Sequence, residues 1–386
     1  MQRRLFLLSS FTALLMGSAM AYTTEELFSV RTDEAEGFER KDFSPVGGNF
    51  DFTAIVHRDM TIWHADSSDE DGEALLKIYF PERRDELMIE GHRAQFPSFA
   101  QAMLAGHGFL ANRGFDKIIR DLERSNHVFA LLSAAQTDET GAYKKMARLA
   151  AVSHGKDVLL LYAELEYDDY KQYEPVLSRF FGSLTMKDDA FSTDALRSVK
   201  ATGGETFLVP VEWSLSEPAD AAPPIKDYKL DLAADQEYPN ITLQIRPGDL
   251  DKARELGATM VKDFSEQVQA SGKADFVTEA DMQTKKRSSG TAYAHSYARG
   301  WDVRESGIPM LTQMIVQQNV SPKSISLITF DGYDSVRKAL SFSPEDRDQL
   351  YKWWVTGGSA FALVQLSLAD GIESVEADLS LRKIGR

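Results

Sequence analysis

The feature that most constrains the fold of this chain is a weak self-similarity at one spacing. Three pairs of segments align 166–167 residues apart: LKIYFPERRDEL at Leu76 with LQIRPGDLDKAR at Leu243, DETGA at Asp138 with RESGI at Arg304, and VSHGKDVLLLYAELEYDD at Val152 with NVSPKSISLITFDGYDS at Asn319. Separated matches that share one spacing are what a duplication produces. We therefore expect two similar domains, with two unrelated domains as the alternative.

Both copies predict the same order of elements: alternating strands, a long helix, more strands and a closing helix. In the second copy the long helix is expected from Asp249 to about Ala270, with Asp249 as its N-cap. A last strand is expected at Phe361–Leu368. Strands joined by short turns pair antiparallel. The sequence thus predicts an α+β fold in which each domain is an antiparallel sheet flanked by helices.

The pattern also predicts the domain boundaries. They are 1–21 for a signal peptide, 22–187 for the first domain, 188–203 for a linker, 204–368 for the second domain and 369–386 for a polar tail. A mature chain of this length has enough apolar residues to form two cores.

One stretch at the end of the first copy resembles a known family. Val158–Leu184, VLLLYAELEYDDYKQYEPVLSRFFGSL, combines an apolar strand, an acidic aromatic turn and a final helix. In this it resembles the PsbP/DcrB-like envelope proteins, here as a tandem pair. The resemblance implies an architecture and a compartment, and proteins of that fold are mostly non-enzymatic accessory or assembly factors.

The first 21 residues have the three parts of a secretory signal peptide. Arg3 and Arg4 precede the apolar stretch Leu5–Met16, and Ala19 and Ala21 are the small residues of a cleavage site after Ala21. The apolar stretch is too short to span a bilayer. We expect a bacterial periplasmic or secreted protein without stable membrane insertion after cleavage. General secretion and the twin-arginine route both stay open, and a buried N-terminal helix is the alternative.

Charge and cysteine content exclude several functions. The net charge is −16, and cleavage would remove two arginines and no acid, which gives −18. Such a chain repels nucleic-acid phosphates and anionic lipids, so we expect no nucleic-acid partner. The absence of cysteine excludes disulfides, thiol catalysis and iron–sulfur clusters. The single compact basic run, Lys285–Arg287, predicts a solvated hairpin tip.

No motif assigns a catalytic residue, a metal or a cofactor. His57 and His64 fall on opposite faces of a predicted strand, so they cannot share a metal ion. The acidic run from Ser67 lacks a calcium loop's final glutamate, because Ile78 stands at position twelve. Nucleotide-binding and serine-nucleophile motifs are absent. A hydrolase that uses carboxylates or a metal nevertheless stays open as an alternative.

The aromatic residues of the resembling stretch offer one candidate surface. Tyr167, Tyr170 and Tyr173 recur every three residues and form a helical stripe, which serves either a protein partner or core packing. We expect an exported, non-catalytic protein that binds a protein partner or small ligand in the cell envelope, in an accessory or assembly role. A periplasmic hydrolase and a secreted factor acting on other cells are the alternatives.

Overall fold

The computed structural model describes thirteen segments of the chain. They are residues 31–45, 50–65, 74–84, 86–121, 128–187, 193–201, 203–217, 226–232, 239–271, 277–303, 308–321, 323–333 and 343–379. The predicted signal peptide, with Ala19 and Ala21, and the acidic run from Ser67 to Asp71 lie outside these residues.

The first copy forms a seven-stranded antiparallel sheet in the order β3-β4-β5-β9-β8-β7-β6. Its strands are β3 (Thr61–His64), β4 (Leu76–Tyr79), β5 (Met88–Gln95), β6 (Lys117–Asp121), β7 (Phe129–Thr137), β8 (Tyr143–His154) and β9 (Asp157–Glu166). A two-residue turn joins β8 to β9, and Gly155 takes the positive φ of 70° that it requires. β9 is buried over most of its length, as its apolar sequence predicts for a central strand.

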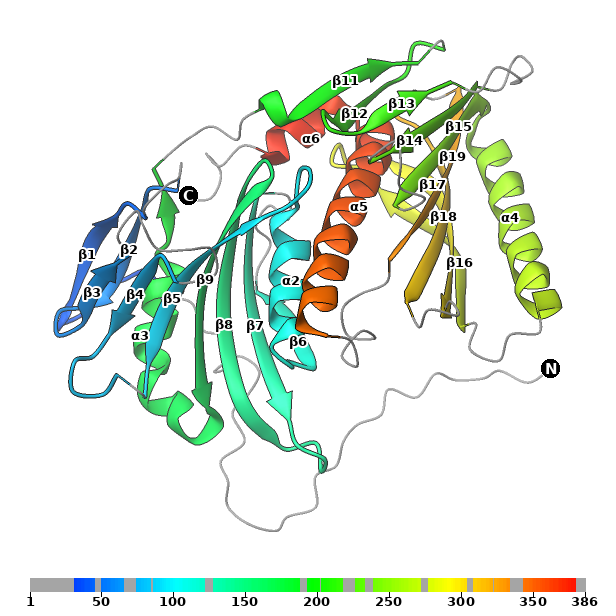
Figure 1. The fold of residues 1–386 in the computed structure, drawn as a ribbon. Helices are drawn as coiled ribbons and strands as arrows, with labels where there is room; N and C mark the ends of the chain where they lie inside the picture. The colour runs from blue at the N-terminus through cyan, green and yellow to red at the C-terminus, as the bar shows by residue number, and fades with distance from the viewer. Residues whose placement is uncertain are drawn as a thin grey trace.

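The second copy forms another seven-stranded antiparallel sheet, in the order β13-β14-β15-β19-β18-β17-β16. Its strands are β13 (Ser214–Ser216), β14 (Lys226–Asp231), β15 (Asn240–Pro247), β16 (Val277–Lys286), β17 (Ala292–Val303), β18 (Pro309–Gln318) and β19 (Ser324–Tyr333). Each strand has a counterpart at the same place in the first sheet. The predicted α+β fold with two similar domains is therefore confirmed (Figure 1).

Each sheet is covered on both faces by equivalent elements. One face packs against α2 (Ala102–Asn112) in the first copy and α4 (Leu250–Ser271) in the second. The other face packs against α3 (Tyr170–Gly182) or α5 (Pro344–Asp370) together with a small sheet. The remaining elements are β1 (Phe38–Phe43), β2 (Phe52–His57), β10 (Thr185–Met186), β11 (Leu196–Lys200), β12 (Thr206–Pro210), α6 (Ile372–Leu379) and the short helices η1 (Tyr167–Asp169) and η2 (Thr193–Ala195). As predicted, Asp249 caps α4, since its carboxylate accepts a 3.1 Å hydrogen bond from the backbone N–H of Lys252.

The spacing between the copies is not uniform along the chain. β9 and β19 begin at Asp157 and Ser324, an offset of 167 residues, whereas β5 and β15 begin at Met88 and Asn240, an offset of 152. Most of the difference comes from α4, which has 22 residues against 11 in α2. The alignment of Leu76 with Leu243 therefore matched β4 to β15, although the counterpart of β4 is β14.

Two further expectations differ from the structure. The segment 188–203, predicted as a linker, contains β11, which pairs with β12. Phe361–Leu368, predicted as a strand, belongs to α5. Its apolar side chains serve two cores at helical spacing, since Phe361, Val364 and Leu368 pack in the second core and Leu363 packs in the first.

The predicted polar tail contributes to the core of the first domain. It contains α6, and Val375 and Leu379 on this helix are 3% and 1% exposed within the first core. The N-terminal half of α5 also lies against the first domain, between α2 and the second sheet (Figure 1). Near the middle of α5, Ser359 accepts a 2.8 Å hydrogen bond from the backbone N–H of Gln101. The C-terminal helices therefore hold the two sheets together.

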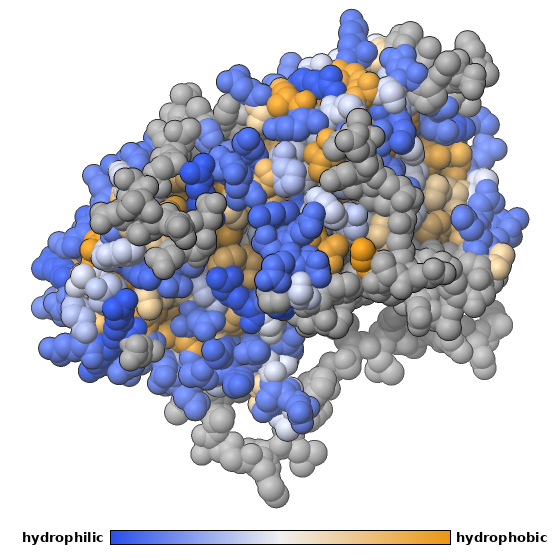
Figure 2. Space-filling model, in the orientation of Figure 1, coloured by the Kyte–Doolittle hydropathy of each residue, from blue (hydrophilic) through white to orange (hydrophobic). Residues whose placement is uncertain are grey.

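The surface carries few large apolar side chains. Among the described residues, the large hydrophobic side chains that are exposed are Tyr143, Val211 and Val320. Among the residues coloured in Figure 2, hydrophilic side chains predominate on the face shown. No helix of the described part of the chain combines the length and apolar character that crossing a membrane requires.

The basic run at the β16–β17 hairpin is only partly a solvated tip. Lys285 and Lys286 are exposed, but the Arg287 side chain folds back over the Tyr293 ring, 4.6 Å from its centroid. Its guanidinium donates hydrogen bonds of 2.7 Å to the carbonyl of Ala369 and of 2.7–2.9 Å to those of Gln318 and Asn319. Arg287 thus ties the end of α5 to the sheet, because Ala369 lies in the last turn of that helix.

Replacing Arg287 by alanine should lower the free energy of unfolding by about 2–3 kcal/mol, because three carbonyls lose a charged donor. Arg287→Lys should recover only part of this loss, since an ammonium cannot reproduce the planar fork. Urea unfolding of both variants measures the effect. Lys286→Ala on the same hairpin is the control, and an equal loss in that variant would contradict the anchoring role.

Candidate functional site

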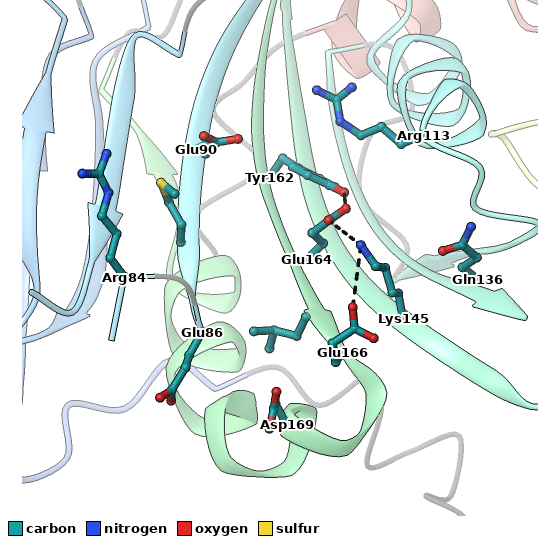
Figure 3. A pocket seen from close by; sticks show the side chains of 12 residues that line it. Arg84, Glu86, Glu90, Arg113, Gln136, Lys145, Tyr162, Glu164, Glu166 and Asp169 are labelled. Carbon is teal, nitrogen blue, oxygen red and sulfur yellow. Dashed lines mark hydrogen bonds and ion pairs between the residues drawn. The ribbon is translucent and has the colours of Figure 1, made fainter. Parts of the chain in front are cut away.

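The first sheet has a pocket of about 650 Å³ on the face that α2 partly covers (Figure 3). α2 ends at Asn112, and Arg113 is its C-cap, so the sheet continues beyond the end of the helix. The lining residues are Arg84, Glu86, Met88, Glu90, Arg113, Gln136, Lys145, Tyr162, Glu164, Leu165, Glu166 and Asp169. Five of them are carboxylates and three are cations, which makes this a charged pocket on a sheet face.

Strand alternation explains why β9 contributes charge on this side. Tyr162, Glu164 and Glu166 point to the pocket, while Leu161 before them and Ala163 between them belong to the first core. In the antiparallel register Lys145 of β8 lies directly opposite Glu166. Cross-strand neighbours on one face lie within reach of each other, so the three charged side chains meet in the pocket.

Lys145 connects two of these carboxylates. Its Nζ lies 3.1 Å from Oε1 of Glu164 and 3.8 Å from Oε1 of Glu166. The hydrogen bond to Glu164 raises the pKa of Lys145 above its ordinary value. The Tyr162 hydroxyl also donates to Glu164, and burial raises the pKa of Tyr162, so this group stays protonated. Glu164 therefore accepts from two donors and is held in place (Figure 3).

The upper part of the pocket combines a stacked arginine with a glutamate. The Arg113 guanidinium lies 3.6 Å from the ring centroid of Phe109 and 5.1 Å from that of Tyr162, and burial lowers its pKa. On the opposite wall, the Glu90 carboxylate lies 3.3 Å from Nε2 of His92, and this hydrogen bond lowers the pKa of Glu90. The lowered pKa favours the ionised form of Glu90, and the Arg113 guanidinium stays protonated because the ordinary pKa of arginine lies far above neutrality.

The second copy lacks three of the four charges that strands contribute to this pocket. At the positions that the strand registers equate with Glu90, Lys145 and Glu166, it has neutral residues; these are Thr242, Met310 and Tyr333. Thr329 stands in place of Tyr162, while Asp331, the counterpart of Glu164, keeps a carboxylate and accepts a 2.7 Å hydrogen bond from Thr312. The same fold forms in both copies, so it does not require the charged pocket.

The structure separates the three tyrosines that were the candidate partner surface. Tyr170 and Tyr173 are 0% and 4% exposed and pack in the first core, which agrees with the core-packing alternative. Neither ring is exposed on the outer surface of the domain. Tyr167 is half-buried and lies against Tyr143, with the ring centroids 5.5 Å apart. A role for Tyr167 in binding stays a prediction.

Tyr173 instead stands between two cavities. Its hydroxyl donates to Glu86, which lines the charged pocket. On the other side Tyr173 lines a smaller cavity of about 430 Å³ together with Phe80 and Arg83. It therefore fixes the loop between β4 and β5 that forms one wall of the charged pocket.

The histidines do not gather into a site in the described part of the chain. No group of three or more His, Asp or Glu side chains there could hold a metal ion. His57 packs between the rings of Phe38 and Phe80, with centroid distances of 5.1 and 5.4 Å. His295 is 7% exposed and packs in the second domain.

Comparison with known proteins adds a likeness to one fold. No family model matches the chain, and no curated protein matches it. The solution structure of cyanobacterial PsbP (CyanoP) from Synechocystis sp. PCC 6803 is similar at 15% identity and a TM-score of 0.27, covering 42% of this chain and 92% of that one. The Saccharomyces cerevisiae Ran-binding protein Mog1p is similar at 14% identity and a TM-score of 0.27, covering 45% of this chain and 96% of that one. The likeness is weak and one of fold alone. At this level the predicted resemblance to PsbP-type proteins is confirmed.

Proposed function

We propose that this chain is an exported binding protein of the cell envelope that acts without catalysis and holds its partner or ligand in the charged pocket of the first domain. Export to the periplasm or beyond rests on the N-terminal signal pattern. An accessory or assembly role, in which binding itself is the function, is part of the proposal. A secreted factor that acts on other cells would share the same pocket and differ in its final location.

The observation that carries the proposal is the difference between the two copies. The two sheets have equivalent strand orders, yet three of the four charged strand positions of the pocket are neutral in the second copy. Charged groups on a sheet face that the fold itself does not need are best explained by binding. The first domain therefore carries the site, and the second domain supports it through α5 and α6.

The arrangement favours binding over hydrolysis by carboxylates. A general acid needs a carboxyl pKa raised toward neutrality, whereas the hydrogen bond from His92 lowers the pKa of Glu90. Glu164 and Glu166 both lie within ion-pair distance of the Lys145 ammonium. Groups held in this way suit recognition of charge.

Native mass spectrometry of the protein purified from its own host tests the proposal. We expect a mass that begins at Tyr22, with an added small molecule or a bound protein. In the variant E90T/K145M/E166Y, which has the residues of the second copy, we expect the same starting residue and loss of the added mass. A retained Met1 would contradict export, and an added mass that survives the three substitutions would contradict the pocket.

A matched control separates the pocket from overall charge. The variant E212T/K262M/E266Y makes the same changes at exposed positions in the second copy. It alters net charge by the same amount, so it should keep the added mass. Equal loss in both variants would show that binding depends on bulk charge and would remove the pocket from the proposal.

A further inference from the structure

The charged pocket also indicates which kind of ligand it takes. We infer that it binds a lysine or arginine side chain presented by a partner polypeptide, with the aliphatic stem against the floor and the cationic head between carboxylates. This inference rests on the proposed function, because it specifies the ligand of the same pocket.

The first argument is the state of the cations that already line the pocket. The Arg113 guanidinium is stacked on Phe109 and Tyr162, and the Arg84 guanidinium lies 5.0 Å from the ring centroid of Tyr79. Lys145 is held by two carboxylates of one wall. Each cation therefore already has a ring or an anion against it. The carboxylates outnumber the cations five to three, so an incoming cation is attracted more than an anion.

The second argument is how the carboxylates are distributed. Glu86 and Glu90 come from the β5 side, Glu164 and Glu166 from β9, and Asp169 from the lower end (Figure 3). They therefore approach the cavity from more than one wall. Met88 and Leu165 supply apolar surface in the same lining. Long basic side chains match this combination, because they bury an aliphatic stem while the charged head stays near polar groups.

The third argument is that Lys145 shows what this wall binds. Its ammonium lies between Glu164 and Glu166, so the aliphatic chain of Lys145 reaches from β8 toward the neighbouring strand β9. A second ammonium from a ligand would compete for the same carboxylates. The net charge of −16 for the whole chain adds a long-range attraction for cationic partners.

The polypeptide source of the cation follows from the proposed function, in which the pocket holds a partner. Lysine and arginine side chains on the surface of a partner protein have the aliphatic stem and the charged head that this lining fits. The exposed Tyr143 is not part of the pocket. A β-bulge places Tyr143 opposite Thr137 and Lys145 opposite Gln136, so the side chains of Tyr143 and Lys145 point to opposite faces of the sheet.

The position of Met88 in the pocket provides a direct reporter. The full mature chain labelled with ¹³C-methyl methionine is titrated with a blocked Gly/Ala heptapeptide that contains two lysines, and the Met88 methyl resonance is followed by NMR. Met260, which is 6% exposed on α4 in the other domain, is the internal control. We expect Met88 to shift with saturation and Met260 to stay unchanged. The same peptide with two glutamates should not shift Met88.

Two substitutions with opposite expected signs test the charge argument. Glu166→Gln should weaken binding of the lysine peptide about threefold, because one exposed carboxylate is lost. Lys145→Gln should tighten it about threefold, because a competing ammonium is removed. A merely structural effect of either change would not produce opposite signs. Raising the salt concentration should weaken binding in both variants.

The remaining outcomes are also decisive. Tighter binding of the glutamate peptide than of the lysine peptide, with the effects of Glu166→Gln and Lys145→Gln both reversed, would overturn the cationic ligand. It would still support the pocket as the binding site. Binding of spermidine without binding of the lysine peptide would overturn the polypeptide source. No shift of Met88 with any of these probes would overturn the inference altogether. The proposed function is judged separately, by the masses of the protein from its own host, which use none of these probes.

Discussion

Replacing Tyr351 with alanine is expected to lower the free energy of unfolding of the whole chain by about 3–5 kcal/mol, which is the usual cost of removing a large buried aromatic side chain. Tyr351 lies on α5 but packs in the first domain, against Phe96 at a centroid distance of 5.4 Å. It is 4% exposed, and its hydroxyl donates a 2.7 Å hydrogen bond to the carbonyl of Ala105. The variant should therefore weaken the contact between the domains.

Gly108 makes this contact possible and provides the sharper test. A Cβ at this position of α2 would lie 2.2 Å from Cε2 of Tyr351, too close for any real contact. Gly108→Ala should therefore destabilise the protein by about 1–2 kcal/mol, although alanine favours a helix over glycine by about 1 kcal/mol. In the Tyr351→Ala background the conflict with the Tyr351 ring is removed, and the closest remaining atom is Cζ3 of Trp354 at 3.3 Å, which has to move by only a few tenths of an ångström. There the same Gly108→Ala change should be neutral or stabilising.

Urea unfolding of the two single variants and the double variant measures this coupling. Tyr351→Phe is the control, because it keeps the ring against Gly108 and loses only the hydrogen bond, at a cost of about 1 kcal/mol. Simple additivity of Gly108→Ala and Tyr351→Ala would contradict the contact. So would a Tyr351→Phe variant as unstable as Tyr351→Ala.

The order and type of most elements could be predicted because they depend on local periodicity. β8, β9 and α3 follow from alternating and helical apolar patterns, and the turn at Gly155 follows from its residue type. The helix α5 was harder to predict, because apolar residues on more than one side of a helix produce a pattern that resembles a buried strand. Phe361 faces the second core while Leu363 faces the first. A helix that packs between two domains has no single apolar face, so its pattern is ambiguous.

The duplication was predictable, although its boundaries were not. The spacing of 167 residues holds where the strands follow one another through short loops, as in β9 and β19. A helix can lengthen without changing the sheet, because its extra turns extend past the strands. For this reason the longer α4 shifts the earlier strands out of register, and Leu76 aligned with the wrong partner.

The candidate site could be found only in part. The alternation of Glu164 and Glu166 with apolar residues on β9 is visible in the sequence and indicates charge on one sheet face. The partner strand is not visible there, since Lys145 meets them only through the register of β8. Glu90 on β5 and Arg113 at the end of α2 also line the pocket, and both are farther from β9 in the sequence than Lys145 is. The sequence pattern favoured the tyrosine stripe instead, because its helical spacing is visible within one short segment. In the structure Tyr170 and Tyr173 pack in the first core, and Tyr167 packs against it.

His295 should make the second domain sensitive to acid. It lies on β17 between Tyr293 and Tyr297, 7% exposed, with centroid distances of 6.3 and 6.2 Å to the two rings. Burial lowers the pKa of His295 to about 4, and the nearby charges of Lys285 and Arg299 act in the same direction. The imidazole is therefore neutral in the folded protein at neutral pH.

The direction of the pH dependence follows from this shift. The unfolded chain binds a proton at His295 with a pKa near 6.5, whereas the folded chain does so only near 4. Protonation therefore favours the unfolded state, and stability is lost as the pH falls from 6.5 toward 4. The full loss corresponds to roughly 3 kcal/mol.

Urea unfolding at pH 7 and pH 4.5 should reveal this loss when wild type is compared with His295→Gln. Carboxylates such as Glu90, whose pKa is lowered by folding, also lose their stabilising effect in acid, but they are common to both proteins and cancel. Wild type should therefore lose about 2 kcal/mol more than His295→Gln between the two pH values. His64→Gln, at an exposed histidine of β3, should behave as wild type. If His295→Gln and wild type lose the same stability, the imidazole is hydrated in the folded state, and β17 must open at this position.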